Sequence, residues 1–181
     1  MRIVVTGGTG FIGTALTRHL IGVNHQVVVL TRKHPEGAVL SQRGLSVQHW
    51  DGVSVDPVLP SLEGSDAVIN LAGEPMDARR WSVAQKKRIV GSRVNTTNAL
   101  VSAIEHASQR PRVLVNASAV GFYGARGDEE ITEASGKGSG FVSDTAQKWE
   151  QAAARAGTMG TRIVLLRTAV RIFLQVGVVL A

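Results

Sequence analysis

Six short runs rich in Val, Ile and Leu divide the chain and constrain its fold more than any other feature. Five of them are Arg2–Thr6, Gln26–Thr31, Asp66–Ala72, Arg112–Ser118 and Arg162–Arg167, and the sixth, Ser46–Trp50, is weaker because it contains a single Val. Unbroken apolar runs of this length are typical of strands buried on both faces of a parallel sheet. Longer segments with helical patterns lie between them at Phe11–Gly22, Val83–His106 and Ser143–Ala156. The alternation predicts an α/β protein with a doubly wound parallel sheet between two helical layers.

Two stretches interrupt this alternation and are predicted as loops. Ser54–Ser65 contains Pro57 and Pro60, and Gly124–Gly140 is rich in glycine. No internal repeat or low-complexity linker divides the chain, so residues 1–168 are predicted to form one domain.

Composition excludes several classes of function. Hydrophobic residues make up 44% and charged residues 19% of the 181 positions, which is typical of a globular chain. The absence of cysteine excludes disulfides, thiolate metal sites and a cysteine nucleophile. The five histidines show no metal-ligand spacing, so we expect no metal site. No apolar run approaches the roughly 20 residues that span a bilayer, and no signal peptide precedes the first strand. We therefore expect a cytoplasmic protein, or one of an organelle stroma, with no membrane partner.

A glycine-rich turn follows the first predicted strand directly. Thr6–Gly13 reads TGGTGFIG and leads into the first predicted helix. Glycine allows the tight turn, the close approach of a pyrophosphate to the backbone and the packing of helix on strand. The start of the helix offers N–H groups and a positive dipole end to the anion. We expect a Rossmann-type dinucleotide site whose pyrophosphate is held by Gly7, Thr9, Gly10, Phe11, Ile12 and Gly13.

The end of the second strand predicts which dinucleotide binds. NAD-selective sites usually carry an acid here, about 20 residues after the glycines, that holds the ribose 2′-hydroxyl. This chain has Thr31, Arg32 and Lys33 instead, and no acid before Glu36. Because a guanidinium can pair with a 2′-phosphate, NADP(H) is favoured, with NAD(H) as the alternative. Lys and Arg outnumber Asp and Glu by 20 to 14; because basic residues gather where the cofactor would lie, we expect no nucleic-acid partner.

With these residues in view, the chain resembles the extended and atypical short-chain dehydrogenase/reductase superfamily, and more closely its epimerase-family proteins. The resemblance covers about residues 1–168 and includes members named NAD-dependent epimerase/dehydratase, nucleoside-diphosphate-sugar epimerase or cell-division inhibitor. Its marks are TGGTGFIG at Thr6–Gly13, NLAGEP at Asn70–Pro75, KKRIVGSRVNTT within Arg80–Thr97, NASAVGFYG at Asn116–Gly124, KWE at Lys148–Glu150 and LLRT at Leu165–Thr168.

The resemblance implies further roles at the cofactor. Leu71, Ala72 and Gly73 end the fourth strand, where this superfamily passes its backbone along the dinucleotide. Arg93 resembles a phosphate or ribose ligand, and Arg88 lies five residues earlier on the same predicted helix. Trp50 ends the third predicted strand and Asp51 follows it, where an adenine contact is usual.

The resemblance leaves the catalytic groups less defined. Superfamily reductases use a Ser, a Tyr and a Lys four residues after the Tyr. Ser118 matches the serine position at the end of the fifth strand. The Tyr-x-x-x-Lys motif is absent, because Val142 and Ala146 stand where its residues align. Tyr123 is the only tyrosine of the chain and the remaining candidate for the proton donor, the alternative being an aromatic that packs on its loop.

Superfamily members continue beyond the sixth strand into a substrate lobe. We expect residues 169–181 to be an atypical tail in place of this lobe, and therefore expect exposed apolar residues that favour self-association. The sequence predicts an NADP(H)-binding oxidoreductase or epimerase-like protein that acts on an unknown carbonyl or sugar-nucleotide substrate, with little activity in this 181-residue form. The alternative is a non-catalytic module that senses a nucleotide, with cell division as one setting.

Overall fold

The computed structural model describes residues 1–32, 43–76 and 80–169. Within these ranges a six-stranded parallel sheet has the order β3-β2-β1-β4-β5-β6. Its strands are β1 (Arg2–Thr6), β2 (Gln26–Thr31), β3 (Leu45–His49), β4 (Ala67–Asn70), β5 (Val113–Ala119) and β6 (Arg162–Thr168). From β1 the chain adds β2 and β3 on one side, and then crosses back to place β4 on the other side of β1. This reversal places a topological switch point between β1 and β4, where ligands of such sheets bind.

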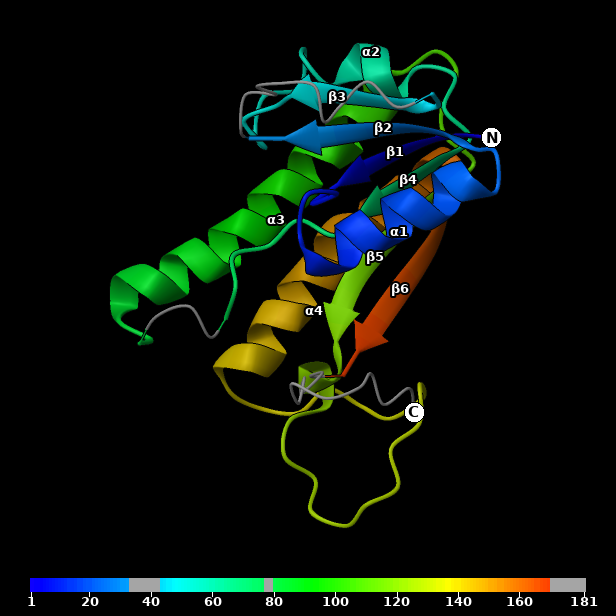
Figure 1. Ribbon diagram of the computed structural model, residues 1–181. Helices are drawn as coiled ribbons and strands as arrows, with labels where there is room; N and C mark the ends of the chain where they lie inside the picture. Colours follow the sequence, from blue (N-terminus) through cyan, green and yellow to red (C-terminus); the bar gives the residue numbers. More distant parts are fainter. Residues whose placement is uncertain (33–42, 77–79, 170–181) are drawn as a thin grey trace, which may run out of the picture.

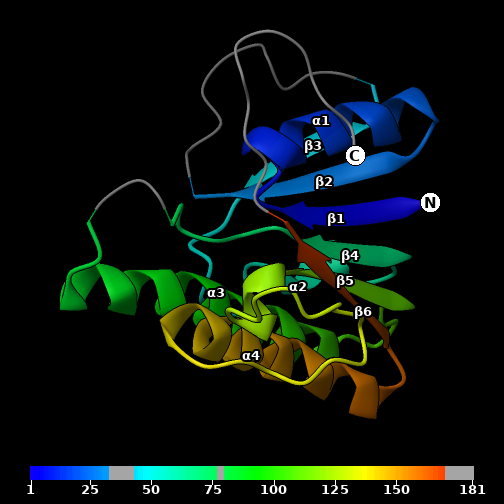
Figure 2. The same ribbon diagram turned by 90° about the horizontal axis from the view of Figure 1, so that it is seen from below.

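Helices cover both faces of the sheet, as Figures 1 and 2 show. One face carries α1 (Phe11–Gly22), and the other carries α2 (Leu59–Leu62), α3 (Val83–His106) and α4 (Phe141–Ala154). Short 3-10 helices follow β5 and α4 at Val120–Tyr123 (η2) and Arg155–Met159 (η3). The predicted doubly wound fold of Rossmann type is therefore confirmed.

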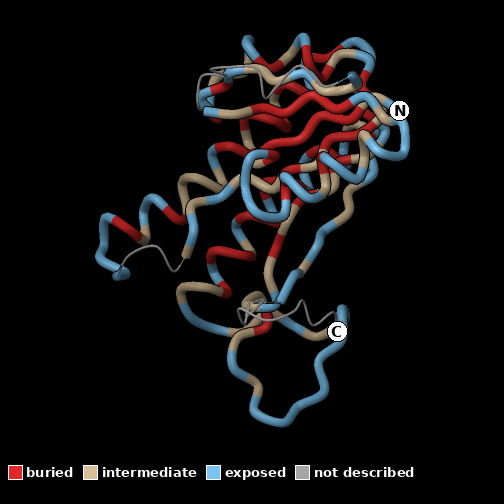
Figure 3. Tube along the Cα trace, in the orientation of Figure 1, coloured by how far each residue is buried: buried red, intermediate tan, exposed pale blue. Residues whose placement is uncertain are grey.

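Alternate residues of the central strands enter two separate cores. Val4 of β1 packs with Leu100 and Ile104 of α3, whereas Ile3 and Val5 face the side of α1. The strands therefore lack a polar face, which explains why their sequence runs show no polar alternation. Figure 3 shows this buried centre of the sheet, with exposure increasing toward the loop below β5 and β6.

Several element boundaries shift by one or two residues from the sequence prediction, and one predicted loop contains a helix. The fourth strand ends at Asn70 rather than Ala72, because the chain leaves the sheet there to line the pocket described below. The predicted loop Ser54–Ser65 contains the helix α2, in which Pro60 takes one of the first two positions. A proline at the first turn loses no hydrogen bond, since the N–H groups there have no intrahelical acceptor. The last helix begins at Phe141, two residues before the predicted start.

The first turns of α3 extend beyond the sheet (Figure 1). The hydroxyl of Ser82 caps this helix by accepting a hydrogen bond from the backbone N–H of Gln85, at 3.2 Å. The 24 residues of α3 give it a length of about 36 Å. It therefore both covers the sheet and forms a wall beside the carboxyl ends of the strands. Residues 170–181, which carry nearly all of the predicted tail, lie outside the described residues.

Candidate functional site

The glycine turn joins β1 to α1 through close backbone contacts. The backbone N–H of Gly10 donates to the carbonyl of Gly7 at 3.0 Å. Gly7 has a φ of +69°, and a Cβ there would lie 2.8 Å from the carbonyl carbon of Leu71. A Cβ at position 13 would lie 2.1 Å from the carbonyl oxygen of Gly7. Glycine at these positions therefore lets α1 pack tightly onto the turn.

The start of α1 is suited to an anion. Its capping residue, Gly10, contributes no side chain, and no acidic residue lies in the first turn. The N-terminus of a helix carries a partial positive charge from its aligned peptide dipoles. The side chains of Phe11 and Ile12 point mainly to solvent, with 69% and 50% of their surface exposed. Only their backbone is therefore placed to help hold a phosphate.

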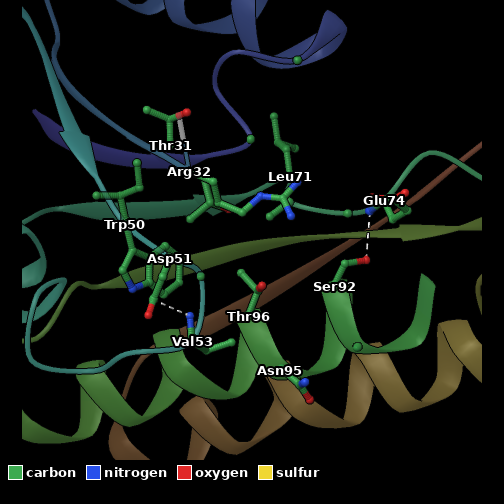
Figure 4. Close-up of a pocket in the computed structure, with 18 of the residues that line it drawn as sticks. Thr31, Arg32, Trp50, Asp51, Val53, Leu71, Glu74, Ser92, Asn95 and Thr96 are labelled. Carbon is green, nitrogen blue, oxygen red and sulfur yellow. Dashed lines mark hydrogen bonds between the residues drawn. The ribbon is translucent and has the colours of Figure 1, made fainter. Parts of the chain in front are cut away.

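A pocket of about 480 Å³ opens at the switch point, between the glycine turn and α3 (Figure 4). It is lined by residues from β1 and the glycine turn, from the ends of β2, β3 and β4, and from α3: Thr6, Gly7, Thr9, Gly10, Leu30, Thr31, Arg32, Trp50, Asp51, Gly52, Val53, Leu71, Ala72, Gly73, Glu74, Arg88, Gly91, Ser92, Asn95 and Thr96. Pockets of about 300–1,000 Å³ are usual for cofactors.

The structure brings most of the predicted cofactor residues to this pocket. Eight of them line it: Gly7, Thr9, Gly10, Thr31, Arg32, Leu71, Ala72 and Gly73. Phe11, Ile12 and Gly13 are outside the lining, at the adjoining start of α1. The side chain of Arg32 extends into the pocket toward Leu71 (Figure 4), and within the described residues it makes no hydrogen bond or ion pair.

Arg93 lies beside the pocket wall, with its guanidinium next to Gly73. It does not line the pocket. Its Nη1 donates to the carbonyl oxygens of Glu74 at 3.0 Å and Ile89 at 3.1 Å, and its guanidinium lies over the ring of Trp149. Burial lowers the pKa of Arg93, and the charge of Glu74 partly opposes this shift. These contacts place Arg93 against the backbone that follows β4, and its role at the cofactor stays a prediction.

Several lining residues lie within the quoted KKRIVGSRVNTT segment, but the sequence alone does not predict which of its side chains face the pocket. Ser92 Oγ accepts from the backbone N–H of Glu74 at 2.9 Å, and so ties α3 to the loop after β4 (Figure 4). Thr96 lies beside Gly52, where an added Cβ would be 3.3 Å from the threonine hydroxyl. The one signal in the sequence is that Ser92 and Thr96 lie in the same segment as Arg93.

The turn after β3 is held by one carboxylate. Asp51 accepts hydrogen bonds from the backbone N–H groups of Val53 at 2.9 Å and Ser54 at 2.8 Å, and from the Ser54 hydroxyl. These hydrogen bonds lower the pKa of Asp51 to about 2, and the two from Ser54 have the largest effect. The indole N–H of Trp50 donates to the Ser54 carbonyl at 2.7 Å. The turn thus places Trp50 and Asp51 at one end of the pocket.

A buried polar network lies directly behind the pocket. The amide of Asn70 donates to Thr97 Oγ1 at 2.8 Å and to Asn116 Oδ1 at 2.6 Å, while its oxygen accepts from Thr6 Oγ1 at 2.6 Å. The indole N–H of Trp149 also donates to Thr97, at 3.0 Å. The network fixes the ends of β1, β4 and β5 against α3 and α4, because buried polar groups tolerate few alternative partners.

The two candidate catalytic residues lie in a separate cluster. Ser118 is only 3% exposed, and its hydroxyl donates to Glu150 at 2.5 Å. Arg167 binds the same carboxylate through Nε and Nη2, both at 2.8 Å, and donates from Nη1 to the Tyr123 hydroxyl at 2.8 Å. Hydrogen bonding to Glu150 raises the pKa of Arg167. Glu150 and Arg167 therefore connect Ser118 with Tyr123, a role that sequence analysis did not assign to them.

Neither Ser118 nor Tyr123 lines the cofactor pocket. Tyr123 borders a second hollow of about 800 Å³ at the ends of η2 and β6. At the positions that align with the missing Tyr and Lys, Val142 packs against Gly121 and Ala146 is buried. A catalytic role for Ser118 or Tyr123 stays a prediction.

The described residues contain neither a membrane-spanning helix nor a cluster of potential metal ligands. No helix within residues 1–32, 43–76 and 80–169 is long and apolar enough to span a membrane. Over the same part of the chain, no group of three or more His, Cys, Asp or Glu residues is placed to hold a metal ion.

The sheet with its switch-point pocket and glycine turn defines a nucleotide-binding protein of Rossmann type. The chain belongs to the NAD dependent epimerase/dehydratase family, which matches residues 3–169. It is 38% identical to human epimerase family protein SDR39U1 over 173 residues, 94% of this chain and 54% of that protein. It is 35% identical to epimerase family protein YfhF of Bacillus subtilis over 170 residues, 92% of this chain and 54% of that protein.

Solved structures agree with this placement. Human SDR39U1 (isoform 2) with NADPH has a TM-score of 0.77 and 38% identity, and the match covers 92% of this chain and 53% of that one. A nucleoside-diphosphate sugar epimerase of Corynebacterium glutamicum has a TM-score of 0.76 and 34% identity, over 92% of this chain and 33% of that one. The chain spans about half the length of the curated relatives it matches.

Proposed function

We propose that the chain binds NADP(H) in the switch-point pocket and prefers it to NAD(H). The observation that carries this proposal is Arg32, a cation at the end of β2 that lines the pocket and has no partner among the described residues. A guanidinium at this position suits a 2′-phosphate. The human relative whose structure contains NADPH supports the same preference.

The residues present fit a dinucleotide along the whole pocket. The glycine turn and the uncapped start of α1 suit the pyrophosphate. Trp50 and the turn held by Asp51 provide an apolar and hydrogen-bonding end for the adenine. Leu71, Ala72 and Gly73 line the pocket where the nicotinamide half of the dinucleotide would lie. When bound, NADP(H) would supply or accept a hydride, and the protein would bind, orient and shield it.

We further propose Tyr123 rather than Ser118 as the proton donor if the protein acts on a carbonyl or sugar-nucleotide substrate. The proton of Ser118 is directed to Glu150. The Tyr123 hydroxyl accepts from Arg167, and its own proton makes no hydrogen bond within the described residues. The guanidinium would stabilise the phenolate left after proton transfer.

The second candidate function is a non-catalytic module that senses NADP(H). The apolar residues Val142 and Ala146 favour it, because they leave α4 without the usual acid and its cationic partner. An assay of NADPH oxidation with a panel of carbonyl compounds separates the two functions. Turnover by the parent that is lost in Tyr123→Phe supports catalysis, whereas binding of NADPH without turnover supports the sensing module.

The NADP(H) preference is tested with Arg32→Gln. Losing a charged hydrogen bond costs about 1.5–3 kcal/mol, which corresponds to about tenfold to a hundredfold in affinity. Titration should show this loss for NADPH and little change for NADH. Equal weakening of both cofactors would mean that Arg32 does not read the 2′-phosphate.

A further inference from the structure

We infer that Arg88 holds the pyrophosphate of the dinucleotide from α3, opposite the glycine turn, and that Gln85 positions it. The inference rests on the proposed function, since it assumes that the pocket takes a dinucleotide. Two arginines of α3, Arg88 and Arg93, lie near the pocket and make different contacts. Arg93 binds backbone carbonyls and does not line the pocket, whereas Arg88 does line it.

The charge of Arg88 is not neutralised within the described part of the chain. Its Nε and Nη2 both donate to the side-chain oxygen of Gln85, at 3.0 and 2.6 Å. This acceptor is a neutral amide, and no carboxylate in the described ranges pairs with Arg88. The Nη1 group makes no hydrogen bond to the described residues. A full positive charge with free donors therefore remains at the edge of the pocket, which suits a phosphate.

Gln85 holds the guanidinium of Arg88 in one orientation through these two hydrogen bonds. Its side chain is 1% exposed, and its backbone N–H is tied to the capping hydroxyl of Ser82. Its Nε2 is buried without an acceptor among the described residues. An unpaired buried donor costs free energy, so this arrangement is poorly explained by stability alone. It is explained if the amide oxygen has to remain directed at Arg88.

Arg88 and Arg32 are placed to contact different phosphates. Thr96 lies beside Gly52 at the end of the pocket formed by the turn after β3. Arg88 comes eight residues before Thr96, a distance of about 12 Å along the helix axis. Arg32 comes from the end of β2, next to the turn that suits the adenine. The pyrophosphate that Thr9 and Gly10 would hold is the anion left for Arg88 to contact across the pocket.

The test compares four ligands on the full 181-residue chain by titration calorimetry: NADPH, NADH, ADP and adenosine. Arg88→Gln should weaken NADPH, NADH and ADP by about tenfold each, the effect of losing one charged hydrogen bond. Adenosine, which lacks phosphate, should bind unchanged. Lys87→Gln is the matched control, since Lys87 is an exposed neighbour on the same helix that does not line the pocket. It should leave all four affinities unchanged.

The role of Gln85 is tested with Gln85→Leu, which keeps the site filled and removes the amide oxygen. It should weaken the three phosphate ligands less than Arg88→Gln does, and the double variant should be no weaker than Arg88→Gln alone. An independent loss in the double variant would mean that Gln85 supports only the fold. Equal binding by Arg88→Gln and Lys87→Gln would overturn the inference, as would a loss confined to NADPH. If the parent binds neither dinucleotide, the proposed function itself fails.

Discussion

Arg93 donates a hydrogen bond to the carbonyl oxygen of Glu74 at 3.0 Å, and this contact joins the middle of α3 to the loop that leaves β4. Gly73 allows the approach, because a Cβ there would lie 3.0 Å from the guanidinium carbon. The loop contributes Leu71, Ala72 and Gly73 to the pocket wall. The position of this wall therefore depends on a side chain that does not itself line the pocket.

Arg93→Lys should weaken NADPH binding by about tenfold, because an ammonium cannot keep the planar contacts with two carbonyls and the Trp149 ring. The midpoint of thermal unfolding should fall only slightly. Arg155→Lys is the control, since Arg155 bonds Asn98 on the exposed surface of the α3–α4 layer. Unchanged affinity in Arg93→Lys would show that the wall holds its position without this residue.

Gly10→Val should abolish NADPH binding while the protein stays folded. Gly10 has a φ of −80°, which any residue adopts, but a branched side chain would fill the space of the pyrophosphate. Fluorescence titration measures the binding, and circular dichroism measures the fold. Gly22→Ala, where an added Cβ meets no atom within 4 Å, should bind like the parent. Equal affinity in Gly10→Val and the parent would contradict the location of the site.

Gly13→Ala should impair folding rather than binding alone. The added carbon would lie 2.1 Å from the Gly7 carbonyl oxygen, and backbone atoms surround the position. Relief requires α1 to move away from the turn, so we expect a loss of about 1–3 kcal/mol, as for other overpacked sites. Urea unfolding measures it. A variant as stable as the parent would show that α1 can shift without cost.

Glu150→Gln should destabilise the protein by about 3 kcal/mol, because it leaves the charge of Arg167 in a largely buried cluster without its carboxylate. Glu129→Gln is a matched control at the exposed ion pair with Arg126, and it should change the free energy of unfolding by less than about 1 kcal/mol. Urea unfolding of both variants gives the comparison. Similar values for the two would mean that the Glu150–Arg167 pair contributes no more than a surface pair.

The contribution of the turn after β3 to the free energy of unfolding should depend on pH through the ionisation of Asp51. Its pKa is lowered from 3.8 to about 2 in the folded protein, so the folded state favours the ionised form. The stabilisation is present above pH 3.8 and is lost as the pH falls toward 2. The difference in unfolding free energy between the parent and Asp51→Asn should therefore be constant above about pH 5 and shrink below it. A difference independent of pH would contradict the role of the ionised carboxylate.

The sequence by itself determined the elements that depend on neighbours in the chain. Strands buried on both faces need apolar runs, and the glycine turn needs residues without a Cβ, so the sequence predicts β1, β2 and the turn directly. The apolar run of β6 also predicts a strand, but this strand is partly exposed at the edge of the sheet. The short helix α2 was missed because its prolines indicate a turn as strongly as they indicate the start of a helix.

Only the tertiary structure decided which side chains face the pocket. Ser92, Thr96 and Arg88 line it because α3 crosses behind the ends of β1 and β4, and no spacing within the helix records that crossing. The same packing turns Arg93 toward backbone carbonyls and directs the Ser118 hydroxyl to Glu150, 32 residues later. Local patterns reflect the periodicity of one element, whereas a site depends on the register between elements, which is set by the packing of the whole core.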